Sequence, residues 1–191
     1  MRAHLFWAAA ALAAAIAAHA AFTLYVPGWW FSRSLAKLAA VHGENTFFIL
    51  DGAEQAKLFP GLPRFGVTGV CLFDLSKGDV TFSADLPDGF WLTTIYTNKA
   101  EPVYSVNNRQ SGENMFTVRL SQAPGLLEQV MQATHRETAE IGTGWTVQSP
   151  EAGGLAVVWY PVADAELRPI AAKAVARSRC AAAPAISQGT E

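Results

Sequence analysis

The sequence predicts an α+β fold, in which an N-terminal transmembrane helix precedes a mostly antiparallel β-sheet or sandwich with two packed helices. Three observations lead to this fold class. The first 30 residues carry one formal charge, on Arg2. Residues 68–109 alternate apolar and polar side chains between turn residues, which is typical of consecutive half-buried strands. The expected elements then follow as strands, helix, strands, helix, and this order favours α+β.

The N-terminal segment is long and apolar enough to cross a bilayer. Residues 5–26 contain no Asp, Glu, Lys or Arg, and a spanning helix needs about 20 such residues. We expect Pro27 and Gly28 to end the helix. An aromatic belt at the level of the headgroups would follow, formed by Trp29, Trp30 and Phe31.

A cleaved signal peptide is the alternative for the same segment. Arg2 would supply its positive region, and residues 18–20 (AHA) match an A-x-A cleavage site. The apolar run continues past that site to Val26, which favours an uncleaved anchor. Arg2 with the terminal amine stands on one side of the span and Arg33 and Lys37 on the other, so flanking charge does not set the orientation.

The expected domain organisation has three parts. Residues 1–30 form the membrane anchor or signal peptide, residues 31–180 form one β-rich domain, and residues 181–191 form a disordered tail. Within the domain, residues 32–41 are expected to form a short helix with Ser32 or Ser34 near its N-cap. Residues 46–50 (TFFIL) predict a strand, and the Gly- and Pro-containing residues 51–66 predict a loop.

The central block predicts consecutive strands with turns at residues 76–79 and 87–89. The expected strands are 67–75, 80–85, 90–97, 101–106 and 115–120. Large apolar side chains on the inward faces of the strongest strands should be buried together. The predicted core residues are Phe73, Phe82, Trp91, Ile95 and Val158.

The C-terminal third predicts two helices and two strands. Ser121 can cap a helix whose apolar stripe is Leu126, Leu127, Val130 and Met131. Residues 144–149 and 155–162 are expected to pair as strands across a turn. Residues 170–178 predict a final helix, with Pro169 well placed at its start.

The central block resembles the bacterial domain of unknown function 1254 family, in its short, membrane-anchored form. The resemblance rests on residues 73–78 (FDLSKG), 90–96 (FWLTTIY) and 104–109 (YSVNNR). Asp79 departs from the family pattern, which usually has Pro there. The resemblance implies a bacterial integral membrane protein without a settled activity. It also implies a possible partner from the sister family of unknown function 1214.

Asn107, Asn108 and Arg109 form the most notable polar cluster. Trp91, Tyr96 and Tyr104 are expected nearby on the strands. Together these residues could line a ligand cleft, with rings for stacking, amides for orientation and the guanidinium for a carboxylate. The alternative is a turn, because Asn tolerates left-handed backbone and the cluster precedes Ser111-Gly112.

Asp74 and Asp79 flank a predicted hairpin turn. Paired carboxylates can act as acid and base, but aspartates at such positions more often bond the backbone of their own turn.

Cys71 and Cys180 allow one intramolecular disulfide, which would persist in an oxidising compartment such as the periplasm. The alternative is a buried Cys71 and a free thiol at Cys180.

Composition excludes several functions. The formal net charge is −2, and no basic face indicates a nucleic-acid partner. The four histidines lack metal-ligand spacing, so we expect no metal and no cofactor. The sequence favours a single-pass inner-membrane protein whose periplasmic domain binds a ligand or partner, with the lipid bilayer as a further partner. The alternative is a hydrolase-like envelope enzyme using Asp74 or the Asn107–Arg109 cluster.

Overall fold

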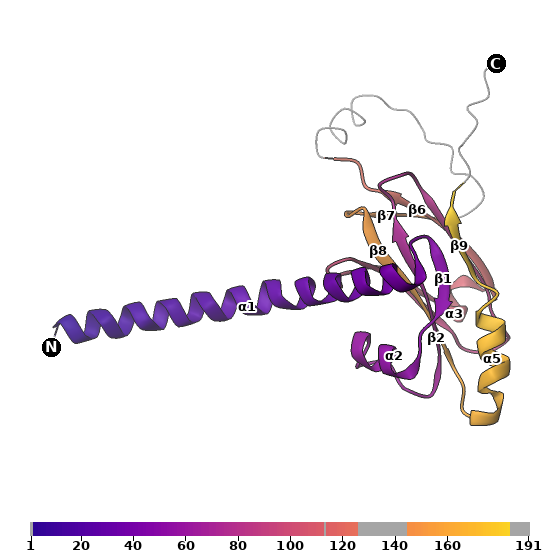
Figure 1. Cartoon of the computed structure of the whole chain (residues 1–191), viewed down its shortest axis with the longest axis horizontal. Helices are drawn as coiled ribbons and strands as arrows, with labels where there is room; N and C mark the ends of the chain where they lie inside the picture. The colour runs from indigo at the N-terminus through magenta and orange to yellow at the C-terminus, as the bar shows by residue number, and fades with distance from the viewer. Residues whose placement is uncertain (1, 113, 126–144, 184–191) are drawn as a thin grey trace, which may run out of the picture.

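The computed structural model describes residues 2–112, 114–125 and 145–183, and it confirms the α+β fold class. A long N-terminal helix leads into two β-sheets and a few short helices (Figure 1). The two sheets pack face to face, and the helix enters the domain on the far side of the larger sheet. The apolar stripe expected at residues 126–131 lies outside the described residues.

Helix α1 (Arg2–His42) is continuous over 41 residues. Pro27 therefore does not end it, and the separate helix expected from residue 32 is its second half. A proline removes one backbone hydrogen bond from a helix interior, but here the following turns gain tertiary packing. Phe31, Leu35 and Leu38 are buried against the domain. Phe31 thus belongs to the core and not to the aromatic belt.

Residues 51–66 are not all loop, because helix α2 (Gly52–Leu58) forms within them. The Asp51 carboxylate accepts hydrogen bonds from the backbone N–H groups of Ala53 and Glu54, and Glu54 accepts in return from the Asp51 N–H. This capping box satisfies the free donors of the first turn. The Asp-x-x-Glu spacing signals such a start even within a Gly- and Pro-containing stretch.

The larger sheet has five antiparallel strands in the order β1-β2-β8-β4-β5. Their bounds are Thr46–Ile49, Gly66–Asp74, Gly153–Pro161, Leu92–Thr97 and Pro102–Asn107. One face is covered by the second half of α1 and by α2, which bury Leu35, Leu38 and Leu58 against it. The other face packs on the second sheet.

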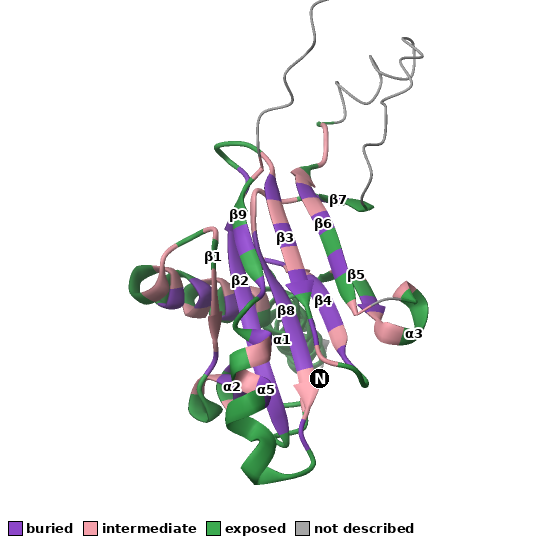
Figure 2. Cartoon of the chain, turned by 90° about the vertical axis from the view of Figure 1, so that its right-hand side faces the viewer, coloured by how far each residue is buried: buried purple, intermediate pink, exposed green. Residues whose placement is uncertain are grey.

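The second sheet has four strands in the order β7-β6-β3-β9. Their bounds are Trp145–Ser149, Met115–Gln122, Val80–Asp85 and Arg179–Ala182. Strands β6 and β7 run parallel, and the other pairs are antiparallel. The inward side chains are buried, and the outer face carries the intermediate and exposed ones (Figure 2).

Four sequence-based predictions are wrong: two concern strand pairing, one concerns a helix cap and one concerns the C-terminal tail. Strands β7 and β8 do not pair with each other, because they lie in different sheets. Strands β2 and β3 also lie in different sheets, so residues 75–79 form a corner between layers and not a hairpin. Ser121 is part of β6 and caps no helix. Ala181 and Ala182 belong to β9 and not to a disordered tail.

The space between the sheets contains the predicted core. Each of the five predicted core residues is at most 3 % exposed: Phe73, Phe82, Trp91, Ile95 and Val158. Helix α5 (Arg168–Val175), preceded by the 3-10 turn η1 (Ala165–Leu167), adds Ala171 and Val175 to this core. The final helix expected at residues 170–178 is therefore present, a few residues earlier.

Cys71 and Cys180 face each other across this core. Cys71 lies on β2 and Cys180 on β9, with Cα atoms 5.9 Å apart. Cysteines at this separation can be bridged without backbone movement. The pair is thus at disulfide distance, in a position to join the two sheets covalently.

Candidate functional site

The predicted polar cluster at residues 107–109 forms a helix start. Helix α3 (Asn108–Ser111) begins after Asn107, whose side-chain oxygen accepts hydrogen bonds from the N–H groups of Arg109 and Gln110 at 3.0 and 3.2 Å. The Gln110 side chain accepts in return from the Asn107 N–H. Gly112 ends the turn with a positive φ of 72°. The turn alternative therefore accounts for the Asn-Asn-Arg sequence.

The three aromatic rings expected beside this cluster do not come together. Trp91 is fully buried between the sheets, where it stacks on Phe116. Tyr96 packs on the opposite face of the larger sheet, against Phe59. Tyr104 packs at the edge of the inter-sheet core. Tyr96 and Tyr104 thus lie on opposite faces of one sheet, so no single cleft contains both.

Arg109 is exposed on α3. Within the described parts of the chain, its guanidinium makes no hydrogen bond or ion pair. The structure therefore does not assemble the six residues Trp91, Tyr96, Tyr104, Asn107, Asn108 and Arg109 into a common cavity.

The two aspartates flanking the β2–β3 corner have separate structural partners. The Asp74 carboxylate accepts hydrogen bonds from the Ser76 N–H at 2.9 Å and from the Ser76 hydroxyl at 2.8 Å. These bonds, with the charge of Lys77, hold the pKa of Asp74 below its usual value. The Asp79 carboxylate pairs with Arg119 Nε at 2.6 Å. The lowered pKa makes Asp74 unsuited to act as a general acid.

A groove of about 610 Å³ lies on the outer face of the four-stranded sheet. Strand β9 pairs with β3 only as far as Arg179 opposite Ser83, whereas β3 continues to Asp85. The chain between α5 and β9 runs past this unpaired end of β3. The lining residues are Ser83, Ala84, Asp85, Met115, Thr117, Ala176, Arg177, Ser178 and Arg179.

The groove presents groups that suit an anionic ligand. Ser178 is 6 % exposed, and its hydroxyl oxygen is buried, so it is not accessible to a ligand in the groove. Arg177 and Arg179 flank it, are exposed and make no ion pair within the described ranges. Guanidinium groups recognise carboxylate and phosphate through paired hydrogen bonds. Asp85 offsets part of the positive charge.

The sequence does not reveal this groove, because β9 has no strand signature of its own. Arg179–Ala182 is short and half alanine, and alanine is depleted in strands. Its strand conformation depends on pairing with β3, about 100 residues earlier in the chain. The signal that was available is the pair of arginines around Ser178, immediately before Cys180.

The groove lies on the side of the domain opposite the N-terminal helix. Helix α1, the five-stranded sheet and the four-stranded sheet follow as successive layers, and the groove is on the outer surface of the last one. Viewed from the side away from the N-terminus, the four-stranded sheet is in front (Figure 2).

No family model matches the chain, and no curated protein is significantly similar to it. Among solved structures, the VPA0106 protein from Vibrio parahaemolyticus is similar over 83 % of this chain, with 10 % identity and a TM-score of 0.55. A putative uncharacterized protein from Burkholderia cenocepacia matches 68 % of the chain, with 14 % identity and a TM-score of 0.46. This chain covers 36 % of each of those chains. The first likeness shows a shared fold.

Proposed function

We propose that this chain is a single-pass inner-membrane protein of the bacterial cell envelope. Its β-rich domain faces the periplasm and binds an acidic ligand or partner in the outer groove. The observation that carries the binding proposal is the groove itself, lined by two exposed arginines, Arg177 and Arg179.

Membrane anchoring is supported by the first half of α1. Residues 3–42 form the one helix in the described chain that is long and apolar enough to span a membrane, and its most apolar stretch of 18 residues has a mean hydropathy of 1.9. Every side chain from Ala3 to Pro27 is exposed, and the first half of the helix extends away from the domain (Figure 1). So large an apolar surface needs a nonaqueous partner, and a bilayer fits its length.

The periplasmic orientation is supported by the cysteines. Cys71 and Cys180 lie at disulfide distance, and a disulfide there would persist only in an oxidising compartment. Basic residues near the membrane surface, such as Lys57 and Lys99, do not argue for the opposite orientation. The positive-inside rule counts charges within about 20 residues of the span in sequence, and both lysines lie further along the chain.

The enzyme alternative has no support in the residues that suggested it. Asp74 is bound by Ser76, and Asn107 caps α3. A partner from the sister family of unknown function 1214 stays part of the proposal on the sequence resemblance alone.

Two measurements test anchoring and orientation. The protein should resist carbonate extraction from inner membranes, and protease added to intact spheroplasts should digest its domain. A mature N-terminus at Ala21 would replace the anchor with a secreted form. Digestion of the domain only after cell lysis would place the domain in the cytoplasm.

The binding proposal is tested by amide NMR shifts on the full chain in detergent, with citrate as the probe. Shifts should concentrate at Ser83, Thr117 and Arg179. Arg179→Gln should weaken binding several-fold, since one charge-assisted contact is lost. Lys173→Gln, which removes the same charge from α5 outside the groove, is the matched control. Equal weakening by both substitutions would mean that citrate responds to overall charge and not to the groove.

A further inference from the structure

Three cations meet helix α1 where it enters the domain. A Cβ placed on Gly28 would lie 3.4 Å from Cβ of Lys99, in the β4–β5 loop. The Arg33 guanidinium lies over the Trp29 ring, 4.9 Å from its centroid. The Lys57 ammonium, on α2, lies 5.9 Å from the centroid of the Trp30 ring. We call Arg33, Lys57 and Lys99 the collar.

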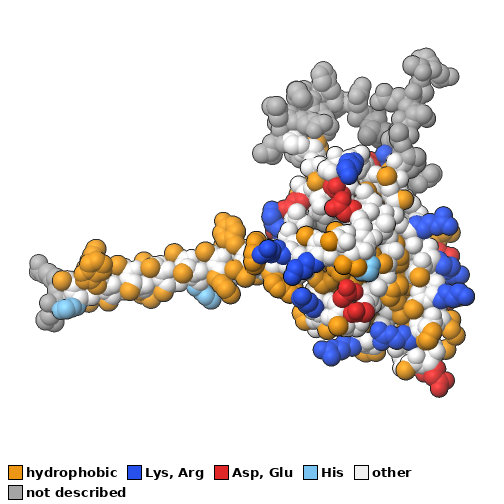
Figure 3. Space-filling view, viewed as in Figure 1, with side chains coloured by type: hydrophobic (Ala, Val, Ile, Leu, Met, Phe, Trp, Pro, Cys, Tyr) orange, Lys and Arg blue, Asp and Glu red, His pale blue; other side chains and the backbone are white. Residues whose placement is uncertain are grey.

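The helix geometry spreads these cations around the helix. Consecutive helix residues point about 100° apart, so positions 28, 29 and 30 cover more than half of the circumference at nearly one height. Each of these positions has a different collar residue beside it, contributed by α1, α2 or the β4–β5 loop. The space-filling view shows Lys and Arg side chains gathered where the helix joins the domain (Figure 3).

The collar coincides with the end of the apolar span. Residues 5–26 precede it without an acidic or basic side chain. Three aromatic side chains are exposed at the junction: Tyr25 by 74 %, Trp29 by 59 % and Trp30 by 40 %. Such rings prefer the headgroup region of a bilayer. If residues 5–26 lie among the acyl chains, the collar lies at the height of the lipid phosphates, because α1 is unbroken at this point.

The collar keeps a net positive charge. Lys99 forms an ion pair with Glu151 from the β7–β8 turn, and this partner raises the pKa of Lys99. Arg33 and Lys57 make no ion pair within the described ranges, and both are exposed. Glu101 lies beside Lys99 in the cavity of about 740 Å³ between α1 and the loop. Two of the three cations are thus available to an external anion.

We propose that the collar binds the headgroups of anionic phospholipids and so holds the domain against the bilayer. Arg33 and Lys57 would contact lipid phosphates, while Trp29 and Trp30 lie at the boundary with the acyl chains. Basic residues near an anionic membrane surface each favour binding severalfold. This inference rests on the proposed membrane anchoring, but it concerns lipid selectivity, which anchoring by itself does not supply.

The test compares quenching of tryptophan fluorescence by two brominated lipids. The full chain carrying Trp7→Phe is reconstituted in phosphatidylcholine vesicles that contain either brominated phosphatidylglycerol or brominated phosphatidylcholine at the same fraction. Trp29 and Trp30 are then the tryptophans next to the bilayer. We expect stronger quenching by the anionic lipid, and we expect added salt to reduce the difference.

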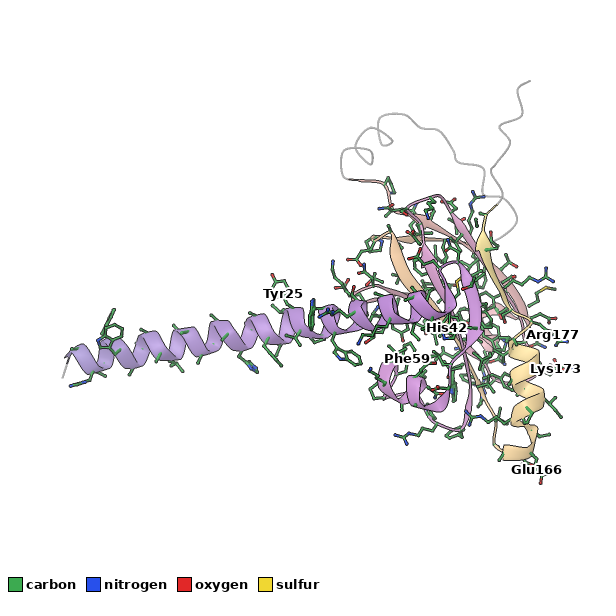
Figure 4. The ribbon with its side chains drawn as sticks, in the orientation of Figure 1. Tyr25, His42, Phe59, Glu166, Lys173 and Arg177 are labelled. Atoms are coloured by element: carbon green, nitrogen blue, oxygen red, sulfur yellow. A yellow bond between two sulfur atoms is a disulfide. The ribbon has the colours of Figure 1, made fainter. Side chains whose placement is uncertain are left out.

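Three substitutions assign the selectivity to the collar. Lys57→Gln or Arg33→Gln should each lower the preference for the anionic lipid by up to about fivefold. Glu151→Gln should raise it, because it frees Lys99. Lys173→Gln is the matched control: it removes one lysine from α5, which Figure 4 shows on the side of the domain away from the span.

Equal quenching by the two lipids in the parent protein would overturn the collar proposal while leaving the anchor intact. Absence of quenching by either lipid would instead overturn the anchor. If Lys173→Gln lowered the preference as much as Lys57→Gln, the selectivity would come from total charge and the collar would have no special role.

Discussion

The two sheets of the domain differ in how many of their faces are covered. In the five-stranded sheet, eight of the nine residues of β2 are buried. In the four-stranded sheet, β3 and β6 alternate buried residues with intermediate or exposed ones. The first pattern is that of an inner layer with partners on both faces, and the second is that of an outer layer with one face in water.

The difference shows that α1 has two roles. An inner sheet requires a covering layer, and the second half of α1 supplies it together with α2. The membrane segment and the covering segment are therefore parts of one helix. Removing the anchor at residue 30 would leave Leu35 and Leu38 in place, whereas removing the whole helix would expose the face of the larger sheet.

The largest expected effect concerns the link between the sheets. If Cys71 and Cys180 are bridged, the closed loop spans 109 residues, and the chain-entropy model assigns such a loop about 4–5 kcal/mol. Cys180→Ala should lower the free energy of unfolding by up to this amount in urea titrations. Reductant should destabilise the parent protein similarly and leave the variant unchanged. Two alkylatable thiols in unreduced protein would contradict the bridge.

The next effect separates the two halves of α1. Leu35→Ala should lower the free energy of unfolding by about 2–4 kcal/mol, because it opens a cavity on the covered face. Leu12→Ala, the same substitution in the exposed half, should change it by less than about 0.5 kcal/mol. Urea unfolding in detergent, followed by near-UV circular dichroism, measures both. Equal effects would mean that the second half of α1 is only a tether.

A matched pair of isosteric substitutions tests the inner and outer layers directly. Val157→Thr places a hydroxyl on the covered face of β8, where Val157 is 4 % exposed, and should cost about 1–3 kcal/mol. Thr117→Val on the outer face of β6 should stay within about 0.5 kcal/mol of the parent protein. If both were neutral in denaturant titrations, the face of β8 would be open to water.

The smallest effect is at the corner where the chain passes from the inner to the outer sheet. Folding lowers the pKa of Asp74 from 3.8, so its stabilising contribution is present above that value and is lost as pH falls through the lower folded pKa. Asp74→Asn should cost less than about 1 kcal/mol at neutral pH, because the carboxylate is partly solvated. The difference from the parent protein should shrink in acid-unfolding curves below about pH 4.

Local patterns were sufficient for most of the fold. The strand run from β2 to β6 and the five core residues follow from alternation and side-chain size. The predicted grouping of Trp91, Tyr96 and Tyr104 beside residues 107–109 is wrong, and the sequence itself contains the reason. Trp91 and Tyr96 are an odd number of positions apart, and side chains alternate faces along a strand. Residues 107–110 likewise carry an Asn-x-x-Gln pattern that resembles a capping box.

Tertiary contacts decided the features that the sequence did not reveal. Pro27 is compatible with a continuous helix because Phe31 and Leu35 pack on the domain. Strands β7 and β8 are close in sequence but lie in different sheets, since β7 runs beside β6. The groove requires both the early end of β9 and the chain past α5, and neither has a local signature.

If the first half of α1 spans a bilayer as proposed, the unbroken helix also makes the domain respond to the thickness of the membrane. With 41 residues, α1 is about 60 Å long. Its second half packs on the domain, and its first half would lie in lipid. A bilayer thinner than the apolar span is accommodated by helix tilt. Because no loop separates the span from the domain, a tilt of the helix becomes an equal rotation of both sheets. The outer groove lies on the layer away from the helix, so a change in lipid length would then move the groove relative to the membrane surface.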